Sequence, residues 1–289
     1  MPGSLAFPML VSLVLAAVAT SVHRRLPPRL AARFVTIALV LVVTAALPTA
    51  LAVAVAFLAH APVIGFGFEW CAQAMGLHSA VPPWLGGPVV VLIAVGSVRV
   101  FRLLRQHRTL RIASPHPIHF AHSHKPYAVT LPGPAGQIVI STAMVDLLDE
   151  EEQRIVIAHE RAHARYRHDR YLLTAELAAA ALPPLRAMAK RVNYSIERWA
   201  DEAAAAACGD RRLVAMTLGK VALQTSPPTV AGFAGLGVAS RMGALLEPPS
   251  QNPHGVQLLV LWSSMVVTAG FSLYQLHHLE RLLTALCAH

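Results

Sequence analysis

The sequence of 289 residues contains few charged side chains: they make up 13% of it, whereas 55% of its residues are hydrophobic. In a typical soluble domain about a quarter of the residues are charged. The positive mean hydropathy of +0.52 agrees with this shortage of charge. The composition therefore argues against an ordinary soluble domain and indicates a membrane protein.

Cysteine is also scarce, because the chain has only Cys71, Cys208 and Cys287. No two of them form a C-x-x-C pair, so neither a zinc ribbon nor a disulfide framework is indicated. Cys71 and Cys287 fall on the same side of the membrane in the topology predicted below, which permits a bridge between them. Unpaired thiols are the simpler interpretation.

Acidic residues number 15 against 24 lysines and arginines, which gives a formal net charge of +9. A basic chain can bind nucleic acid. Nine of the basic residues, however, lie beside predicted membrane spans, where attraction to anionic lipid accounts for them. The sequence therefore predicts contact with a lipid bilayer and no direct contact with nucleic acid.

Apolar runs without charge are the most prominent feature of the chain. About 18 or more such residues can cross the roughly 30 Å hydrocarbon layer of a membrane. We predict four spans, over residues 5–22, 34–59, 84–98 and 255–276. The third is shorter than the others and crosses only if Arg99 and Arg102 extend their side chains toward the membrane surface.

The positions of the arginines predict the orientation in the membrane. Four lie between residues 24 and 33, none between His60 and Leu85, and five between Arg99 and Arg111. Because cytoplasmic loops carry an excess of basic residues, the first loop and residues 99–254 are predicted to be cytoplasmic, with both termini outside. No basic residue precedes the first run, which disfavours a cleaved signal peptide. The expected location is the plasma membrane, with several spans.

The predicted spans divide the chain into three parts: residues 1–111 with three spans, a cytoplasmic domain at 112–250, and a last span with a short outer tail at 251–289. Within the domain, residues 127–131 and 137–141 are β-prone and are separated by Pro132-Gly133-Pro134-Ala135-Gly136. This pattern predicts a small hairpin. Asp149, followed three residues later by Glu152, predicts a capping box that opens a helix.

Further helices are predicted over residues 172–182, 192–207 and 212–224, and residues 226–254 are predicted to form a linker. The first of these helices is interrupted by Glu176 and ends at Pro183-Pro184, so we expect a buried or membrane-apposed helix rather than a fifth span. Gly209 is the expected stop of the second helix.

The motif His159-Glu160-Arg161-Ala162-His163 lies in the helix that follows Asp149. Its two histidines are four residues apart and therefore one helical turn apart on one face, where both can bind the same metal ion. Glu160 lies about 100° around the helix, where it can take a proton from a metal-bound water. The motif predicts a metal centre with its own catalytic base.

A catalytic zinc ion needs a third protein ligand, and the next helix offers one. The stretch IERWADEAAAA places Glu197 and Asp201 one turn apart. Glu197 can be the third ligand, and Asp201 can accept a hydrogen bond from the free ring nitrogen of a ligating histidine. Alternatively, all five polar residues are solvated helix positions. Four apolar residues directly before His159 favour the metal site.

Other polar residues yield weaker candidates. Four histidines near residue 120 either bind a second metal or lie in an exposed loop, and the loop is the simpler interpretation: His116, His119, His122 and His124. His168 is predicted not to be a ligand, because it points about 140° away from His163 on a continuous helix. Tyr194 and Arg241 are two candidates for stabilising an oxyanion. Residues 137–141 are the candidate edge strand for binding an extended substrate.

Three stretches carry a resemblance to a known family: GQIVISTAMVDLL, HERAHARYRHD and IERWADEAAAA, in this order. Together with the spans they resemble the membrane-embedded metallopeptidases typified by BlaR and MecR, the antirepressor proteases of the β-lactam response. The pattern is more distantly similar to HtpX and the CAAX prenyl proteases. The resemblance covers residues 120–247 well and the spans loosely.

The resemblance implies a mostly α membrane protein with an inserted cytoplasmic α+β domain of the zincin-like, gluzincin type. It implies Zn²⁺ held by His159, His163 and Glu197, with Glu160 as base and Asp201 as support. Proteins of the BlaR type carry a large extracellular penicillin-binding domain after the last span. This chain ends soon after residue 276, so we do not expect it to sense a drug in that way.

The predicted function is a zinc-dependent endopeptidase that cleaves cytoplasmic or membrane-associated proteins, in the regulatory role of an antirepressor acting on a BlaI-type repressor. A protease for membrane-protein quality control is an alternative. A metal-binding scaffold without activity is another, but it would not need Glu160. A metal transporter is disfavoured, because transport sites lie near the membrane midplane and these ligands lie outside the spans.

Overall fold

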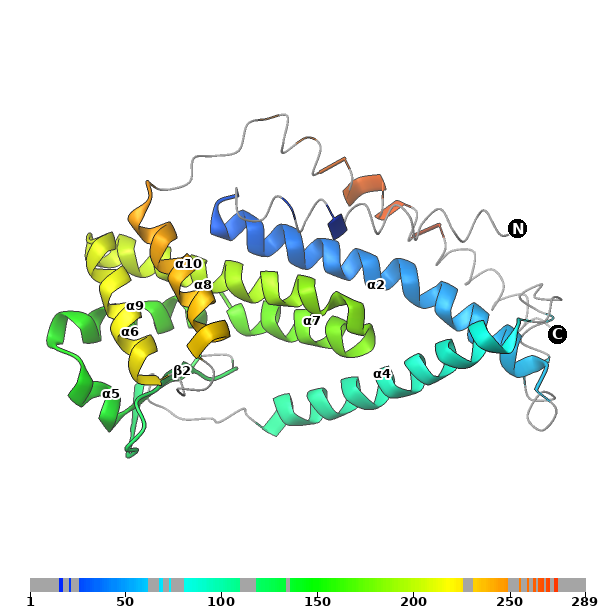
Figure 1. Ribbon diagram of the computed structural model, residues 1–289, viewed down its shortest axis with the longest axis horizontal. Helices are drawn as coiled ribbons and strands as arrows, with labels where there is room; N and C mark the ends of the chain where they lie inside the picture. Colours follow the sequence, from blue (N-terminus) through cyan, green and yellow to red (C-terminus); the bar gives the residue numbers. More distant parts are fainter. Residues whose placement is uncertain are drawn as a thin grey trace.

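The computed structural model describes residues 26–61, 81–109, 118–133, 136–225 and 231–248, with isolated positions elsewhere. Most of these residues are helical (Figure 1). The elements, in chain order, are α2 (Pro28–Ala59), α4 (Pro83–Thr109), β1 (Ile118–Ala121), β2 (Ala128–Thr130), β3 (Ile138–Ser141), α5 (Thr142–Leu147), α6 (Glu150–Arg165), α7 (His168–Ala181), a 3₁₀ turn (Pro183–Leu185), α8 (Arg186–Cys208), α9 (Arg211–Thr225) and α10 (Ala231–Leu246).

Two helices among the described residues, α2 and residues 83–108 of α4, are long and apolar enough to cross a membrane. They contain the predicted spans 34–59 and 84–98, and by length and composition they suggest a membrane protein. Large apolar side chains on α4 are exposed, among them Trp84, Val91 and Phe101. The predicted spans 5–22 and 255–276 lie largely outside the described residues.

The hairpin of α7 and α8 packs between α2 and α4 (Figure 1). Its buried side chains form one core with the first half of α2: Leu26, Phe34, Val35, Leu39, Val42, Ala175, Ala178, Leu185, Met188, Val192, Ile196 and Trp199. On the other side Gly96 of α4 lies against α7, where a Cβ would come within 2.8 Å of the Ala181 carbonyl oxygen. Helix α7 starts four residues before its predicted start and ends, as predicted, before Pro183.

The three strands form a sheet in the order β1-β3-β2, with β3 parallel to β1 and antiparallel to β2. The predicted hairpin of β2 and β3 is therefore confirmed. The prediction that residues 137–141 form an edge strand is wrong, because β1, which was not predicted, pairs with the other side of β3. Strand β2 is an edge strand, and it contacts α6, as does β3.

The ends of the site-bearing helices follow local sequence signals. The Asp149 side chain accepts a hydrogen bond from the Glu152 amide, and the Glu152 carboxylate accepts one from the Asp149 amide, so the predicted capping box is confirmed. Three glutamates in the first turn of α6 also suit the positive end of the helix dipole. Helix α8 ends at Gly209, as predicted, with the left-handed φ of 78° that glycine tolerates.

The predicted linker over residues 226–254 is wrong in its middle, because residues 231–246 form α10. Tertiary packing explains this helix in spite of its glycines. Leu245 is buried against α9, and Met242 lies against Gly219, where a Cβ would come within 2.9 Å of the Met242 Cε. Arg211 donates hydrogen bonds to the carbonyls of Ala244 and Leu245 and so caps the end of α10.

Candidate metal centre

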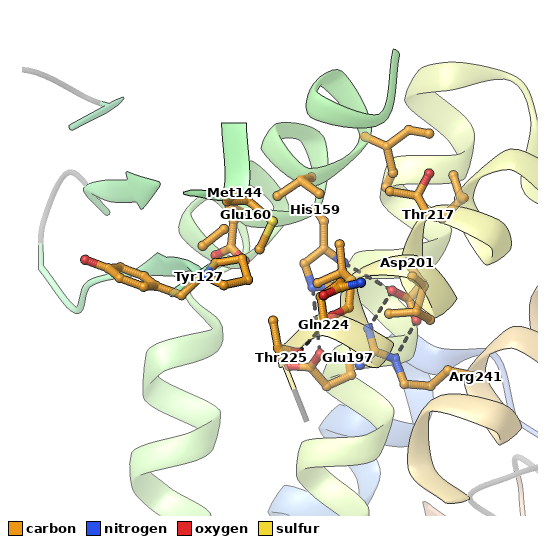
Figure 2. A pocket seen from close by; sticks show the side chains of 18 of the residues that line it. Tyr127, Met144, His159, Glu160, Glu197, Asp201, Thr217, Gln224, Thr225 and Arg241 are labelled. Carbon is orange, nitrogen blue, oxygen red and sulfur yellow. Dashed lines mark hydrogen bonds and ion pairs between the residues drawn. The ribbon is translucent and has the colours of Figure 1, made fainter. Parts of the chain in front are cut away.

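Helices α6 and α8 bring three possible metal ligands together, and Figure 2 shows two of them, His159 and Glu197. The Nε2 atoms of His159 and His163 are 3.1 Å apart. The carboxylate of Glu197 lies 3.7 Å from each of these nitrogens, through Oε2 for His159 and Oε1 for His163. One donor atom from each of the three residues lies within 4.8 Å of the others, so the group can hold a metal ion.

The donor set and its spacing suit zinc. Imidazole nitrogens and carboxylate oxygens about 2.0–2.2 Å from a tetrahedral zinc ion lie roughly 3.3–3.6 Å from one another. The nitrogen–nitrogen separation of 3.1 Å lies just below this range, and the two nitrogen–oxygen separations of 3.7 Å, which involve different oxygens of Glu197, lie just above it. Three protein ligands also leave a fourth position for water or substrate, as catalytic zinc sites require.

Asp201 supports the ligand group from α8. Its Oδ1 lies 3.1 Å from Nδ1 of His159, the ring nitrogen that faces away from the other ligands. The Asp201 side chain is only 3% exposed, and Arg241 of α10 donates to both of its oxygens at 2.7 and 2.8 Å. Arg241 also lies 2.8 Å from Glu197 Oε2, so a single guanidinium pairs with both carboxylates.

Glu160 lies beside the ligands without belonging to their group. Figure 2 shows it on one side of His159, with Asp201 and Arg241 on the other. Thr130 of β2 donates a hydrogen bond of 2.7 Å from its hydroxyl to Glu160 Oε2. The same hydroxyl lies 2.8 Å from the Glu160 carbonyl oxygen. The edge strand therefore fixes the orientation of the Glu160 carboxylate.

Burial and neighbouring charges shift the pKa values of the two histidines in opposite directions. Burial lowers the pKa of His159, but the hydrogen bond to Asp201 and the charges of Asp201 and Glu197 outweigh it, so the pKa is raised. Burial, followed by the positive charges of His159 and Arg241, lowers the pKa of His163 to about 3. His163 is therefore neutral at physiological pH, the form in which an imidazole binds metal, whereas His159 must release any proton that it carries before it can bind a metal ion.

Burial also raises the pKa of the Glu160 carboxyl. The positive charge of His159 and the Thr130 hydrogen bond oppose this effect, but they do not cancel it. A carboxylate with a raised pKa is a better proton acceptor than an exposed glutamate, because its affinity for a proton lies closer to neutral pH. The environment of Glu160 suits a general base.

A cavity of about 840 Å³ opens beside these residues. His159, Glu160, Glu197 and Arg241 line one part of it. The other part is largely apolar and is lined by Met144, Ile155, Val156, Val214, Leu218 and Val221. The cavity therefore combines a polar centre with room for a large apolar group.

The structure brings together every residue of the predicted centre: His159, Glu160, His163, Glu197 and Asp201. Of the two oxyanion candidates, Arg241 is occupied with two carboxylates, and the Tyr194 hydroxyl donates to the Ser240 carbonyl at 3.5 Å. His119, His122 and His124 are exposed and belong to no possible metal group among the described residues, which do not include His116. Asp169 pairs locally with Arg167.

Two residues of the site were not predicted from the sequence. Thr130 has no local signal, because its partner Glu160 is 30 residues away. His168 was predicted to point away, yet its Nδ1 lies 3.1 Å from Nδ1 of His163. Its position five residues after a ligand was the one available signal.

Comparison with known proteins finds a match to one protein family in the segment that contains the His159–His163 motif. Residues 102–192 match the model of Peptidase family M48, whose members are metal-dependent. The matched segment includes the three strands, α6 and α7, whereas Glu197 and Asp201 follow it. No curated protein and no solved structure matches the chain. The match over residues 102–192, together with a His/His/Glu group that can hold a metal ion, supports a metallopeptidase function.

Proposed function

We propose that the chain is a membrane-embedded zinc endopeptidase with its active site on the cytoplasmic side. The observation that carries the proposal is the convergence of His159, His163 and Glu197 beside Glu160, a buried carboxylate that is not one of the three ligands. This arrangement separates metal binding from proton transfer. A scaffold without activity would not need Glu160 in that position.

The chemistry follows from the roles of these residues. His159, His163 and Glu197 would hold Zn²⁺, which when bound supplies a Lewis acid that lowers the pKa of water. Glu160 takes a proton from the water that attacks the scissile carbonyl carbon, and it returns a proton to the amine nitrogen that leaves. Thr130 keeps the Glu160 carboxylate aligned during both transfers.

The edge of β2 is the proposed binding site for the substrate backbone. Tyr127 and Leu131 use their backbone groups to pair with β3, through the Tyr127 carbonyl and the Leu131 amide. Because pairing alternates along an antiparallel strand, the backbone groups of Ala128 and Thr130 point toward the other edge. An extended peptide can add to that edge, and the apolar part of the cavity suits a large apolar side chain near the cleaved bond.

The contacts of α8 support a site at the membrane surface. Arg29 lies 5.5 Å and Arg33 5.9 Å from the ring centroid of Trp199, which is two residues after the ligand Glu197. Both arginines precede the predicted span 34–59, where basic residues mark the cytoplasmic end of a span. We therefore propose the division predicted above: spans in residues 1–111, a cytoplasmic domain at 112–250 and a last span in 251–289.

This topology predicts the location of fused reporters. A reporter fused after Arg111 should be cytoplasmic and one fused after His289 extracytoplasmic, because basic residues flank only the first loop and the segment after the third span. Alkaline phosphatase and green fluorescent protein fusions give opposite readouts for the two sides. A cysteine placed at exposed Arg161 that reacts with an impermeant reagent on intact cells would contradict the arrangement.

The proposed biological role is regulatory. The resemblance to BlaR and MecR suggests a small DNA-binding repressor of the BlaI type as substrate, whose cleavage would release transcription. Degradation of damaged membrane proteins is the second candidate, favoured by the similarity to HtpX. A regulator should cut one or a few proteins at defined bonds, whereas a quality-control protease should cut many unfolded ones.

The experiment that tests the function compares the proteomes of cells that express the wild type and the Glu160→Gln variant. Cleavage products present only with the wild type identify the substrates. A few products with one defined end each support the regulatory role, and many products from membrane proteins support quality control. Identical peptide ends in both strains, under all stimuli tested, would contradict the peptidase itself.

A further inference from the structure

His168, the first residue of α7, is a buried side chain that contacts a proposed zinc ligand. Its exposed fraction is 0%, and its Nδ1 lies 3.1 Å from Nδ1 of His163. Its other ring nitrogen, Nε2, is buried and has no hydrogen-bond partner among the described residues. The rings of Tyr166, Tyr171 and Trp199 surround it, with centroids 6.0, 6.5 and 4.7 Å from its own.

The contact between the two Nδ1 atoms has only one arrangement that suits a metal centre. His163 directs Nε2 toward His159 and Glu197, so Nε2 is the atom that would bind the metal. A neutral ligating imidazole carries its proton on the other nitrogen, which here is Nδ1. Nδ1 of His163 is therefore a donor, and Nδ1 of His168 must be the acceptor.

This assignment also fixes the state of His168. A neutral imidazole that accepts at Nδ1 carries its proton on Nε2. The Nε2–H group then lies among aromatic rings, whose faces are weak acceptors for N–H groups. An apolar environment of this kind keeps the ring neutral, because burial disfavours the charged form.

We infer that His168 is a positioning residue of the zinc site, which accepts a hydrogen bond from Nδ1–H of His163 and fixes the tautomer and orientation of that ligand. The inference rests on the proposed zinc site. It gives each histidine ligand its own support: Asp201 behind His159 and His168 behind His163. Supporting groups of this kind orient the ligand ring and raise metal affinity.

The backbone shows how His168 reaches this place. Helix α6 ends at Arg165, and Arg167 adopts a left-handed conformation with a φ of 55°. Such a conformation is uncommon for a residue other than glycine. It turns the chain so that the first residue of α7 lies back against the last turn of α6. The strained residue therefore serves the contact between His168 and His163.

Three substitutions at position 168 distinguish the effect of the hydrogen-bond acceptor from the effect of side-chain shape. His168→Asn places an amide oxygen near the former position of Nδ1, whereas His168→Gln places its amide near the former position of Nε2. His168→Leu fills the aromatic pocket and has no acceptor. The purified full chain in detergent is titrated with zinc against a competing chelator, and the visible absorption of bound Co²⁺ reports the ligand geometry.

Loss of the acceptor should weaken zinc binding by about 10–100-fold in the Leu and Gln variants and alter the cobalt spectrum. The Asn variant should bind zinc almost as the wild type does. The thermal unfolding of the metal-free Leu variant should match that of the wild type, because leucine suits an apolar pocket. If the Leu variant does not fold, the zinc affinities of the Asn and Gln variants show whether the acceptor is needed.

Equal zinc affinity in the wild type and the Leu variant, or in the Asn and Gln variants, would overturn the role of His168. The proposed metal site would survive that result, because the wild type would still bind zinc. A wild type that binds no zinc, by contrast, would overturn the metal site and this inference together.

Discussion

A Glu160→Gln variant is expected to bind zinc as tightly as the wild type and to lose peptidase activity by about 10²–10⁴-fold. Glutamine keeps the shape of the side chain, and its amide oxygen still accepts the hydrogen bond that Thr130 donates. The amide cannot take a proton from water. Zinc content is measured by elemental analysis, and activity by the cleavage of an unfolded protein or of a substrate found by proteomics.

The matched control is the double variant His159→Ala, His163→Ala, which should lose zinc and activity together because two of the three proposed ligands are gone. Glu160→Gln and the double variant are then equally inactive but differ in zinc content. A double variant with the zinc content of the wild type would refute the metal centre. A Glu160→Gln variant that retains its activity would refute the assigned base.

Replacement of Arg241 by methionine is expected to lower the free energy of unfolding of the metal-free protein by about 3–5 kcal/mol. Arg241 is the cation that pairs with Asp201 and Glu197; its side chain is 12% exposed, and Asp201 is buried. Methionine preserves packing but leaves two carboxylates without that partner. Unfolding is followed by tryptophan fluorescence, since Trp199 lies in the core beside the site.

The pH dependence of the free energy of unfolding shows whether the lost ion pair causes the loss of stability in the Arg241→Met variant. Burial raises the pKa of Asp201, but the hydrogen bonds from Arg241 and His159 outweigh it and lower the pKa to about 2, from an ordinary value of 3.8. The contribution of the ion pair is therefore complete above about pH 4 and is lost as the pH falls toward 2. The difference in stability between variant and wild type should shrink in the same window.

The control for Arg241 is the surface pair of Arg154 and Glu150, whose side chains are 71% and 90% exposed. Arg154→Met removes the same kind of side chain from an ion pair in water and should cost about 0–1 kcal/mol. Equal losses from the two substitutions would mean that the buried cluster does not stabilise the fold through its charges.

The parts of the site that the sequence predicts are those that depend on local geometry. His159 and His163 share a helix face because of the helical period, and the capping box that starts α6 lies within four residues. The ligand Glu197 and the supporting residue Asp201 follow from the same period on α8. Local rules therefore predict the ligands and the helix faces on which they lie, but not how α6 and α8 meet.

The unpredicted parts depend on tertiary contacts or on a break in the period. Strand β1 pairs with β3 across about 20 residues, and Arg241 joins the site from a glycine-rich segment that becomes helical only through packing. His168 was misjudged because the 140° argument assumes one continuous helix. The left-handed Arg167 interrupts the helix, and the angle no longer applies.

The continuity of α8 has a mechanical consequence. This single helix of 23 residues runs from the hairpin tip, packed on α2, to the ligand Glu197. If α2 spans the bilayer as proposed, α8 is rigidly attached to a membrane-spanning helix. The metal centre then lies at a constant distance from the lipid. Substrates tethered to the same bilayer, with a cleavable bond at that height, would meet the site at effective concentrations on the order of millimolar. The length of a substrate's tether, as much as its sequence, would then select the bond that is cut.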